Sequence, residues 1–286
     1  MSTHTNASET TPNLAAPIML PAKRINADWT MLPAWAPLPG LAALAVNSFL
    51  LKGKAPVLVD TGVAPLGDRY LDTLAREIEI KDIEWIWISH ADHDHIGNLQ
   101  MILDRAPKAK VVSQYMGVAK LGLLGFDMRR VQVLQPGAVF EAGDRRLHPV
   151  RPLYYDAPET TGFYDPKAEL LFTVDCFGAL LPRPVHMVED AREADLHAGM
   201  MTWSSLDAPW LNRIDRSAMG RGLAAIERLA PKHVICTHLP VLAGNVTTLT
   251  RPIAEAYCNG NGAAKADPLW VESALAGLQG VAEMAA

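Results

Sequence analysis

The chain has 286 residues, 49% of them hydrophobic, and a formal net charge of −5 at pH 7. A chain of this length can bury a large core, and its acidic balance lacks the basic surface that binds nucleic acid. No run of about 18 uninterrupted apolar residues predicts a membrane span, so we expect neither nucleic acid nor a membrane as a partner. The N-terminal residues lack the basic and apolar regions of a signal peptide, and three scattered cysteines suit reduced thiols, which together predict a cytoplasmic protein.

Composition divides the chain into three parts. Residues 1–16 are polar and rich in Thr, Asn and Ser, which predicts a disordered tail. Residues 17–258 hold the strand and helix patterns and form the predicted domain. Residues 259–286 start with two Asn-Gly pairs and continue as an Ala-rich stretch, which predicts a flexible break and then a C-terminal helical tail over 267–284.

Strand and helix patterns alternate along the predicted domain, which indicates an α/β fold. Residues 17–40 contain five prolines and two tryptophans, a composition typical of extended edge structure or a loop. Residues 116–130 fit a helix or a lid, and residues 179–212, rich in Pro, Trp, His and Met, are expected to be irregular. The other expected elements are a hairpin over 47–51 and 55–59, helices over 65–78, 96–103 and 217–229, and strands over 83–89, 110–113, 139–144, 146–152, 171–175 and 234–238.

The densest chemical signal follows the strand expected at 83–89. The segment His90-Ala-Asp-His-Asp-His95 holds five side chains that can bind a metal. Open α/β sheets bind their ligands at the carboxyl ends of strands, and so dense a cluster of carboxylates and imidazoles would repel itself without a metal. Side chains alternate in an extended loop, so His90 and Asp92 share one side, whereas Asp94 and His95 face different ways and could bind a second metal. A polar turn that faces water is the alternative interpretation.

The same segment, His90-x-Asp92-x-Asp94-His95, resembles the His-x-His-x-Asp-His signature of the metallo-β-lactamase superfamily. Upstream, Val57-Leu-Val-Asp60-Thr-Gly resembles the early strand of that fold. The resemblance spans roughly residues 43–242 and implies a four-layer α/β fold, the αββα metallo-β-lactamase sandwich.

A carboxylate at Asp92, where the common signature has a histidine, is similar to the flavodiiron proteins, which usually have Glu there. Leu171-Phe-Thr-Val-Asp175-Cys-Phe-Gly resembles the segment that carries their metal-bridging carboxylate, and Val234-Ile-Cys-Thr-His238 resembles the strand that ends in their last histidine ligand. Asp156 stands two residues before a proline, as a histidine ligand does in that family, and His148 is the alternative for this position.

The resemblance therefore implies a dinuclear metal site in which Asp175 bridges two ions. Asp60 and His93 are expected beside the ligands rather than on a metal. The implied ligands are His90, Asp92, Asp94, His95, Asp156, Asp175 and His238.

Four of these ligands are carboxylates, whose charge balances that of two divalent ions. An oxygen-rich set without thiolates favours iron or manganese over zinc, so we expect two iron ions, with manganese or zinc as the alternatives. No counterpart of the flavodoxin-like domain of flavodiiron proteins follows His238, so FMN is not expected on this chain and electrons would come from a separate donor protein. The resemblance also allows a homodimer.

Three functions fit such a site. The first is binding or reduction of O2 or a related small oxidant, as an oxidoreductase of flavodiiron-like type. The second is hydrolysis of an ester, lactone or phosphodiester by a metal-bound hydroxide. The third is a non-enzymatic oxygen or redox sensor read by a partner. No Gly-x-Gly-x-x-Gly or Walker sequence indicates a nucleotide site.

Overall fold

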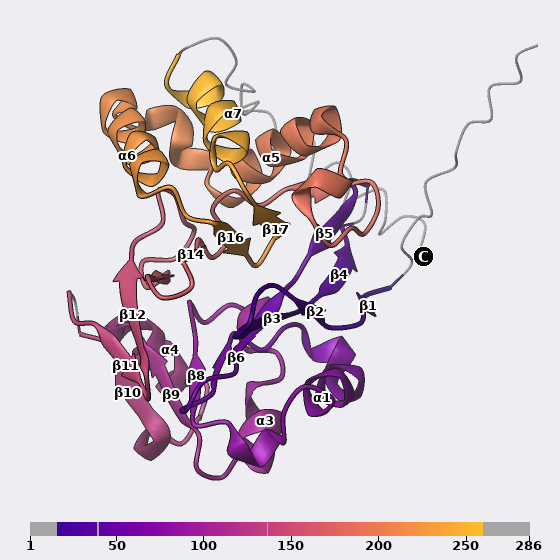
Figure 1. Ribbon diagram of the computed structural model, residues 1–286, viewed down its shortest axis with the longest axis vertical. Coiled ribbons are helices and arrows are strands. Elements are labelled where there is room, and N and C mark those ends of the chain that lie inside the picture. The colour runs from indigo at the N-terminus through magenta and orange to yellow at the C-terminus, as the bar shows by residue number, and fades with distance from the viewer. Residues whose placement is uncertain (1–15, 39, 136, 260–286) are drawn as a thin grey trace, which may run out of the picture.

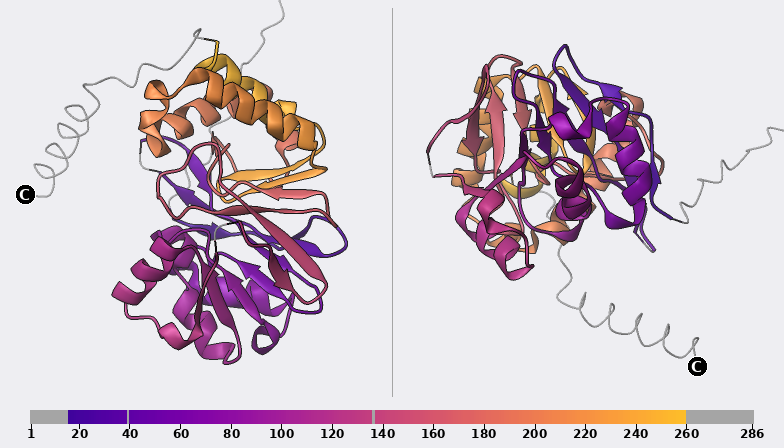
Figure 2. Two further views of the ribbon diagram at one scale, coloured as in Figure 1. Left: turned by 90° about the vertical axis from the view of Figure 1, so that its left-hand side faces the viewer. Right: turned by 90° about the horizontal axis from the view of Figure 1, so that it is seen from below.

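Two large β-sheets pack face to face, and helices cover the outer face of each (Figures 1 and 2). The computed structural model describes residues 16–38, 40–135 and 137–259. The tails predicted at residues 1–16 and 259–286 therefore lie almost wholly outside the described residues. The order of the layers, with helices, sheet, sheet and helices, confirms the expected αββα sandwich.

The first sheet has seven strands, in the order β10-β9-β8-β7-β6-β3-β2. Strands β7 to β10 run parallel, whereas β2, β3 and β6 pair antiparallel with their neighbours. Helices α1 to α4 belong to this half of the molecule. Its elements are β2 (Lys23–Arg24), β3 (Trp29–Leu32), β6 (Ser48–Leu51), β7 (Val57–Val59), α1 (Gly67–Ala75), β8 (Trp85–Trp87), α2 (His93–Ile96), α3 (Leu99–Arg105), β9 (Lys110–Ser113), α4 (Tyr115–Leu123) and β10 (Val131–Val133).

The second sheet has six strands, in the order β11-β12-β13-β14-β16-β17, and a small sheet of order β1-β4-β5-β15 adjoins it. Helices α5 to α7 cover the outer face of this half (Figure 1). Its elements are β1 (Ile18–Met19), β4 (Ala34–Pro37), β5 (Ala43–Ala45), β11 (Phe140–Ala142), β12 (Arg145–Val150), β13 (Gly162–Asp165), β14 (Leu170–Phe172), β15 (Leu180–Leu181), α5 (Glu193–Asp207), α6 (Arg216–Leu229), β16 (His233–Cys236), β17 (Leu239–Ala243) and α7 (Thr247–Tyr257). Short 3-10 helices span η1 (Ala64–Leu66), η2 (Ile80–Asp82), η3 (Met128–Arg130), η4 (Val188–Asp190) and η5 (Pro209–Arg213).

Aromatic side chains from both sheets fill the layer between them. Trp29 of β3 stacks on Phe163 of β13 with ring centroids 5.5 Å apart, and Trp87 of β8 meets the same ring edge-on at 5.2 Å. All three rings are buried. The second sheet covers the inner face of β3 and β6, and helices cover their outer face. Both strands are therefore buried at every position. This packing fixes the two sheets against each other and so fixes the edge that they share.

The strand order brings several carboxyl ends to one edge of the sandwich. Strands β14 and β16 are parallel neighbours, so the segments that follow them, with Asp175 and His238, emerge side by side. The loop after β8 reaches the same place from the first sheet, where Ser89 accepts a hydrogen bond from the N–H of Thr161. The expected convergence of ligands at strand ends therefore has a structural basis.

Two expectations about elements need correction. The segment 17–40 is extended, as expected, but its strand β3 lies inside the first sheet between β2 and β6 rather than at an edge. Pro33 follows β3 directly, so the missing proline N–H removes no ladder hydrogen bond from that strand. The expectation of irregular structure over 179–212 is wrong, because α5 is a helix of 15 residues.

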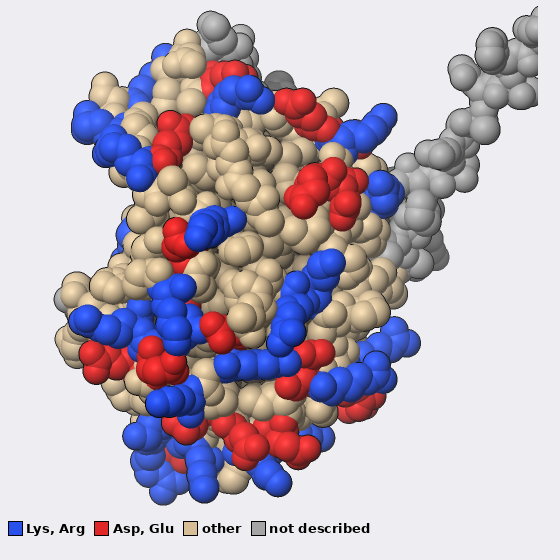
Figure 3. Space-filling model, viewed as in Figure 1, with Lys and Arg blue, Asp and Glu red and all other residues tan. Residues whose placement is uncertain are grey.

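Among the described helices, none has the length and apolar character needed to cross a membrane. On the face shown in Figure 3, Lys and Arg side chains are interspersed with Asp and Glu, most densely over the half that holds α1 and α3. The charge on that face is therefore distributed rather than gathered in one patch.

Gly199 places α5 against the backbone of β15: a Cβ at this position would lie 2.1 Å from the carbonyl oxygen of Leu180. We predict that Gly199→Ala lowers the free energy of unfolding, although alanine normally stabilises a helix interior by ~1 kcal/mol relative to glycine. Gly220→Ala in α6 is the matched control, because a Cβ there meets nothing nearer than Cys258 Sγ at 4.0 Å. Urea denaturation gives the free energy of unfolding of both variants. A higher value for Gly199→Ala than for the unaltered protein would contradict this close packing.

Candidate metal centre

The loop after β8 is held in place by Asp60, which follows β7. The carboxylate of Asp60 accepts hydrogen bonds from the N–H of Ser89 at 2.9 Å and from Ser89 Oγ at 2.7 Å. The same carboxylate lies 2.9 Å from Nδ1 of His95, so Nε2 of that ring faces the interior of the site. Asp60 is buried and has a left-handed backbone conformation with φ 56°, which is unusual for a residue other than glycine. It lies where the sequence analysis expected it, beside the cluster.

All seven residues predicted as ligands reach one cluster. Each belongs to a group of three side chains whose ligand atoms lie within 4.8 Å of one another. The groups are His90, His95 and Asp175; Asp94, His95 and His238; His90, Asp92 and Asp156; and Asp156, Asp175 and Asp207.

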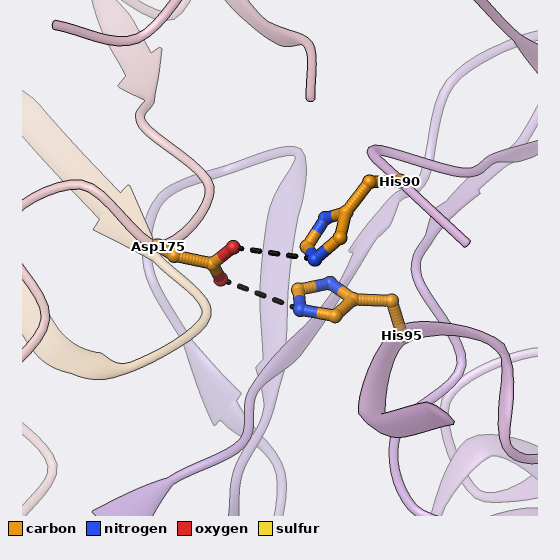
Figure 4. A group of neighbouring side chains, drawn as sticks. All are labelled: His90, His95 and Asp175. Atoms are coloured by element: carbon orange, nitrogen blue, oxygen red, sulfur yellow. Dashed lines mark ion pairs between the residues drawn. The ribbon is translucent and has the colours of Figure 1, made fainter. Parts of the chain in front are cut away.

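Asp175 lies at the middle of this cluster. Figure 4 shows its carboxylate approaching His90 and His95 from the opposite side of the site. Oδ2 lies 3.4 Å from Nε2 of His90, and Oδ1 lies 3.3 Å from Nε2 of His95. Val174 and Phe177, on either side, have φ values of 57° and 75°, so a strained turn presents this carboxylate. Each carboxylate oxygen therefore faces a different imidazole.

His238 follows β16 and completes the second half of the cluster. Its Nδ1 lies 2.7 Å from the carbonyl oxygen of Ala45, which orients the ring, and its Nε2 lies 3.1 Å from Oδ1 of Asp175 and 3.3 Å from Oδ2 of Asp94. Trp203 of α5 covers this histidine with ring centroids 4.6 Å apart, and its Nε1 donates a hydrogen bond to the carbonyl of Asp175 at 3.2 Å. One helix thus fixes both residues.

Asp156, rather than His148, lies in the cluster. Its Oδ1 is 3.8 Å from Nε2 of His90, and about 30% of its side chain is exposed. His148 lies exposed in β12, opposite Tyr164 of β13, and belongs to none of the groups found among the described residues. His93 is exposed on α2 and is likewise outside these groups, although it was expected close to the ligands.

The charges in the cluster shift the pKa values of its members. Burial by itself lowers the pKa of His238, but the charge of Asp175 and hydrogen bonds to Asp175 and Asp94 outweigh it and raise the pKa to about 10. Burial also opposes the charged form of His95, yet the carboxylates of Asp94 and Asp175 raise its pKa well above the usual range. Burial raises and the nearby imidazoles lower the pKa of Asp175, and the imidazoles prevail. In the metal-free protein, His95 and His238 therefore carry protons on the ring nitrogens that cations would bind.

Asp207 is a member of the cluster that the sequence analysis missed. It is the last residue of α5, and its carboxylate joins those of Asp156 and Asp175 within 4.8 Å. Burial and the charge of Asp175 raise its pKa to about 8. The only signal in the sequence is the spacing of four residues from Trp203 to Asp207, which places both on one face of a helix. Because this segment was expected to be irregular, the spacing did not predict that the two side chains lie on one face.

Comparison with solved structures supports the fold. Rubredoxin:oxygen oxidoreductase from Desulfovibrio gigas superposes with a TM-score of 0.72 at 18% identity, over 82% of this chain and 61% of that one. The flavodiiron protein from Giardia intestinalis gives a TM-score of 0.70 at 15% identity, over 84% of this chain and 60% of that one. At such identities the likeness concerns the fold, which is the metallo-β-lactamase sandwich.

Sequence comparison identifies the family. Diflavin flavoprotein A 1 of Synechocystis is 30% identical over 133 residues, which are 46% of this chain and 23% of that protein. The matches cover between 18% and 35% of the length of the curated relatives, so the chain corresponds to about a third of them at most. A family model described as "ODP family beta lactamase" matches residues 44–233, which is most of the domain. These matches confirm the resemblance to the flavodiiron-like branch, and the chain belongs to the ODP family of β-lactamase-like proteins.

Proposed function

We propose that the chain is a dinuclear, iron-binding oxidoreductase that binds and reduces O2 or a related small oxidant. The observation that carries the proposal is the position of Asp175, whose two oxygens face imidazoles from both halves of the cluster. The proposed ligands are His90, Asp92, Asp94, His95, Asp156, Asp175 and His238.

The geometry of the cluster fits two metal ions. Three buried imidazoles point their Nε2 atoms at carboxylates, at 3.1 Å to 3.4 Å from Asp175. The other nitrogen of two of these rings is occupied, by Asp60 for His95 and by the Ala45 carbonyl for His238. Imidazoles oriented in this way by a second hydrogen bond are typical of metal ligands.

The donor set supports iron. The groups consist of imidazoles and carboxylates, whereas the buried Cys176 and Cys236 belong to none of the groups found in the described part of the chain. Oxygen-rich sets without thiolates suit iron and manganese better than zinc. Two redox-active ions, when bound, could each pass one electron at a time from a donor to the oxidant, which the side chains themselves cannot do.

The surrounding side chains limit what reaches the cluster. His90, His95, Asp175 and His238 are buried, while Asp94 and Asp156 are about one third exposed. These two carboxylates therefore form the solvent side of the site, where a small oxidant enters. Water beside them can deliver the protons that reduction of O2 consumes.

Electrons would come from a separate donor protein or from a further domain. The imidazoles and carboxylates of the site are not redox-active, so the proposed reaction needs an electron source beyond the residues that form this site. A homodimer and a cytoplasmic location belong to the same proposal.

The proposal is tested with protein purified without oxygen. Metal analysis should find two irons per chain, and the chemically reduced protein should consume O2 until a chelator removes the metal. Oxygen reduction that persists after metal removal would contradict the proposal. Turnover of esters, lactones or phosphodiesters by a zinc-loaded form would favour the hydrolase instead, since zinc is redox-inert.

Removing the central carboxylate should empty the centre. Asp175→Ala is predicted to lose most of both metal ions, because one carboxylate faces the ligands of both. Asp104→Ala, which removes an exposed carboxylate of α3, is the control and should keep both ions. Plasma mass spectrometry measures metal per chain, and an unchanged metal content in Asp175→Ala would show that the bridging assignment is wrong.

Metal binding should release protons. In the metal-free protein the pKa of His238 is raised to about 10 and that of His95 is also raised, so both rings hold protons at neutral pH. A metal must displace these protons, and its apparent affinity is therefore predicted to fall as the pH is lowered below the raised pKa values. Titration of the metal-free protein with Mn²⁺ in a weakly buffered dye solution measures the release. Binding with no proton release would contradict the predicted protonation.

Asp60 is predicted to strengthen metal binding through His95. Asp60→Asn keeps the shape of the side chain but removes the charge beside Nδ1, so metal affinity should fall by about 10-fold to 100-fold. Asp28→Asn, which alters a partly exposed carboxylate at Arg145, is the control. Competition with a chromophoric chelator gives the affinities; equal values for Asp60→Asn and the unaltered protein would rule out this role.

A further inference from the structure

Helix α5 ends against the proposed metal centre. Trp203 lies over His238 and hydrogen-bonds the carbonyl of Asp175. The fit is close, since a Cβ at Gly178 would lie 2.5 Å from the Trp203 ring. Asp207 is one turn further along the same face, so the docking of Trp203 fixes where the Asp207 carboxylate lies.

One oxygen of the Asp207 carboxylate is left without a hydrogen-bond donor among the described residues. Its Oδ2 is buried and accepts no hydrogen bond from the residues that the structure describes. Its carboxylate forms a group with those of Asp156 and Asp175, in which the three ligand atoms lie within 4.8 Å of one another. A buried carboxylate oxygen without a donor is unfavourable, and two neighbouring carboxylates make it more so.

The position of Asp207 in its helix also makes the negative charge of its carboxylate unfavourable. It is the last residue of α5, and the last turn holds no basic residue. Negative charge at a helix C-terminus is destabilised by the helix dipole. Two independent features, the buried unpaired oxygen and the helix end, therefore indicate that a cation compensates this carboxylate.

We infer, on the basis of the proposed dinuclear centre, that Asp207 is an additional metal-binding side chain at the position formed by His90, Asp92 and Asp156. With Asp175 shared, that position has one imidazole and four carboxylates. The position of Asp94, His95 and His238 has two imidazoles and, with Asp175, two carboxylates. The two positions therefore differ in chemical character.

The difference predicts different metals. Carboxylate-rich sites suit Mn²⁺, whereas imidazole suits iron and zinc. The position completed by Asp207 is accordingly selective for Mn²⁺ relative to its neighbour, and the centre accepts one manganese and one iron when both are supplied. Asp156, whose carboxylate is shared by the groups of His90 and Asp92 and of Asp175 and Asp207, contributes to the same preference.

The test uses metal-free protein loaded without oxygen with equal, limiting amounts of Mn²⁺ and Fe²⁺. Plasma mass spectrometry gives both metals per chain, and electron paramagnetic resonance reports bound Mn²⁺. The unaltered protein should bind both metals in similar amounts. Asp207→Ala and Asp207→Asn should lower bound Mn²⁺ relative to iron by about tenfold or more, while Asp156→His should shift the same position towards iron.

Two control variants test whether the metal ratio depends on the carboxylate at position 207 rather than on any charge change in α5. Glu193→Gln removes an exposed carboxylate from the other end of α5 and should leave the metal ratio unchanged. Asp207→Glu keeps the charge and should retain Mn²⁺. If Asp207→Ala does not fold, Asp207→Asn carries the test, because it keeps the size of the side chain.

The outcomes distinguish this inference from the proposed function. Failure of the unaltered protein to bind two ions would overturn both. Two bound ions with an unchanged manganese-to-iron ratio in the Asp207 variants would overturn the inference alone. An equal loss of both metals would also overturn it, because a purely structural role of Asp207 weakens both positions together.

Discussion

The contact between Asp175 and three imidazoles joins the two halves of this protein. His90 and His95 follow a strand of the first sheet, whereas Asp175 and His238 follow strands of the second. Ion pairs of 3.1 Å to 3.4 Å connect them at the shared edge. The aromatic layer between the sheets sets that edge, so the geometry of the cluster depends on packing at some distance from it.

Charge is the constraint that follows from this arrangement. Carboxylates and imidazoles crowd into a site that is largely buried, and burial disfavours every charged form. The nearby carboxylates raise the pKa values of His95 and His238. In the metal-free protein both imidazoles therefore take up protons, and their positive charge compensates that of the carboxylates. Cations would replace those protons while preserving the same balance, which is why a buried cluster of this kind is compatible with a stable fold.

The backbone near the cluster is strained at residues that position its metal-binding side chains. Asp60 and Val174 both have left-handed conformations, and Val174 is β-branched, which makes that conformation more costly. Asp60 bonds Ser89 and His95, and Val174 directly precedes Asp175. The surrounding β-sheets hold these residues in place, so the rigidity of the sandwich supports the precise placement of the ligands. Helix α5 adds a third support through Trp203.

The sequence by itself determined the ligand loop after β8 and, through the resemblance to flavodiiron proteins, the fold class and six of the residues that meet in the cluster. The loop could be predicted because strand periodicity is local, and the direction of a strand fixes the edge that the residues after it reach. The choice of Asp156 over His148, and the position of β3 inside its sheet, were decided by tertiary structure. Helix α5 was decided there too, since the face that it presents to the protein consists of Leu196, Gly199, Met200, Trp203, Ser204 and Asp207. Only some of these residues are apolar, so no hydrophobic stripe marks the helix in the sequence. Gly199 is useful only because β15 lies against it, and Asp207 only because three carboxylates meet, and neither neighbour is adjacent along the chain.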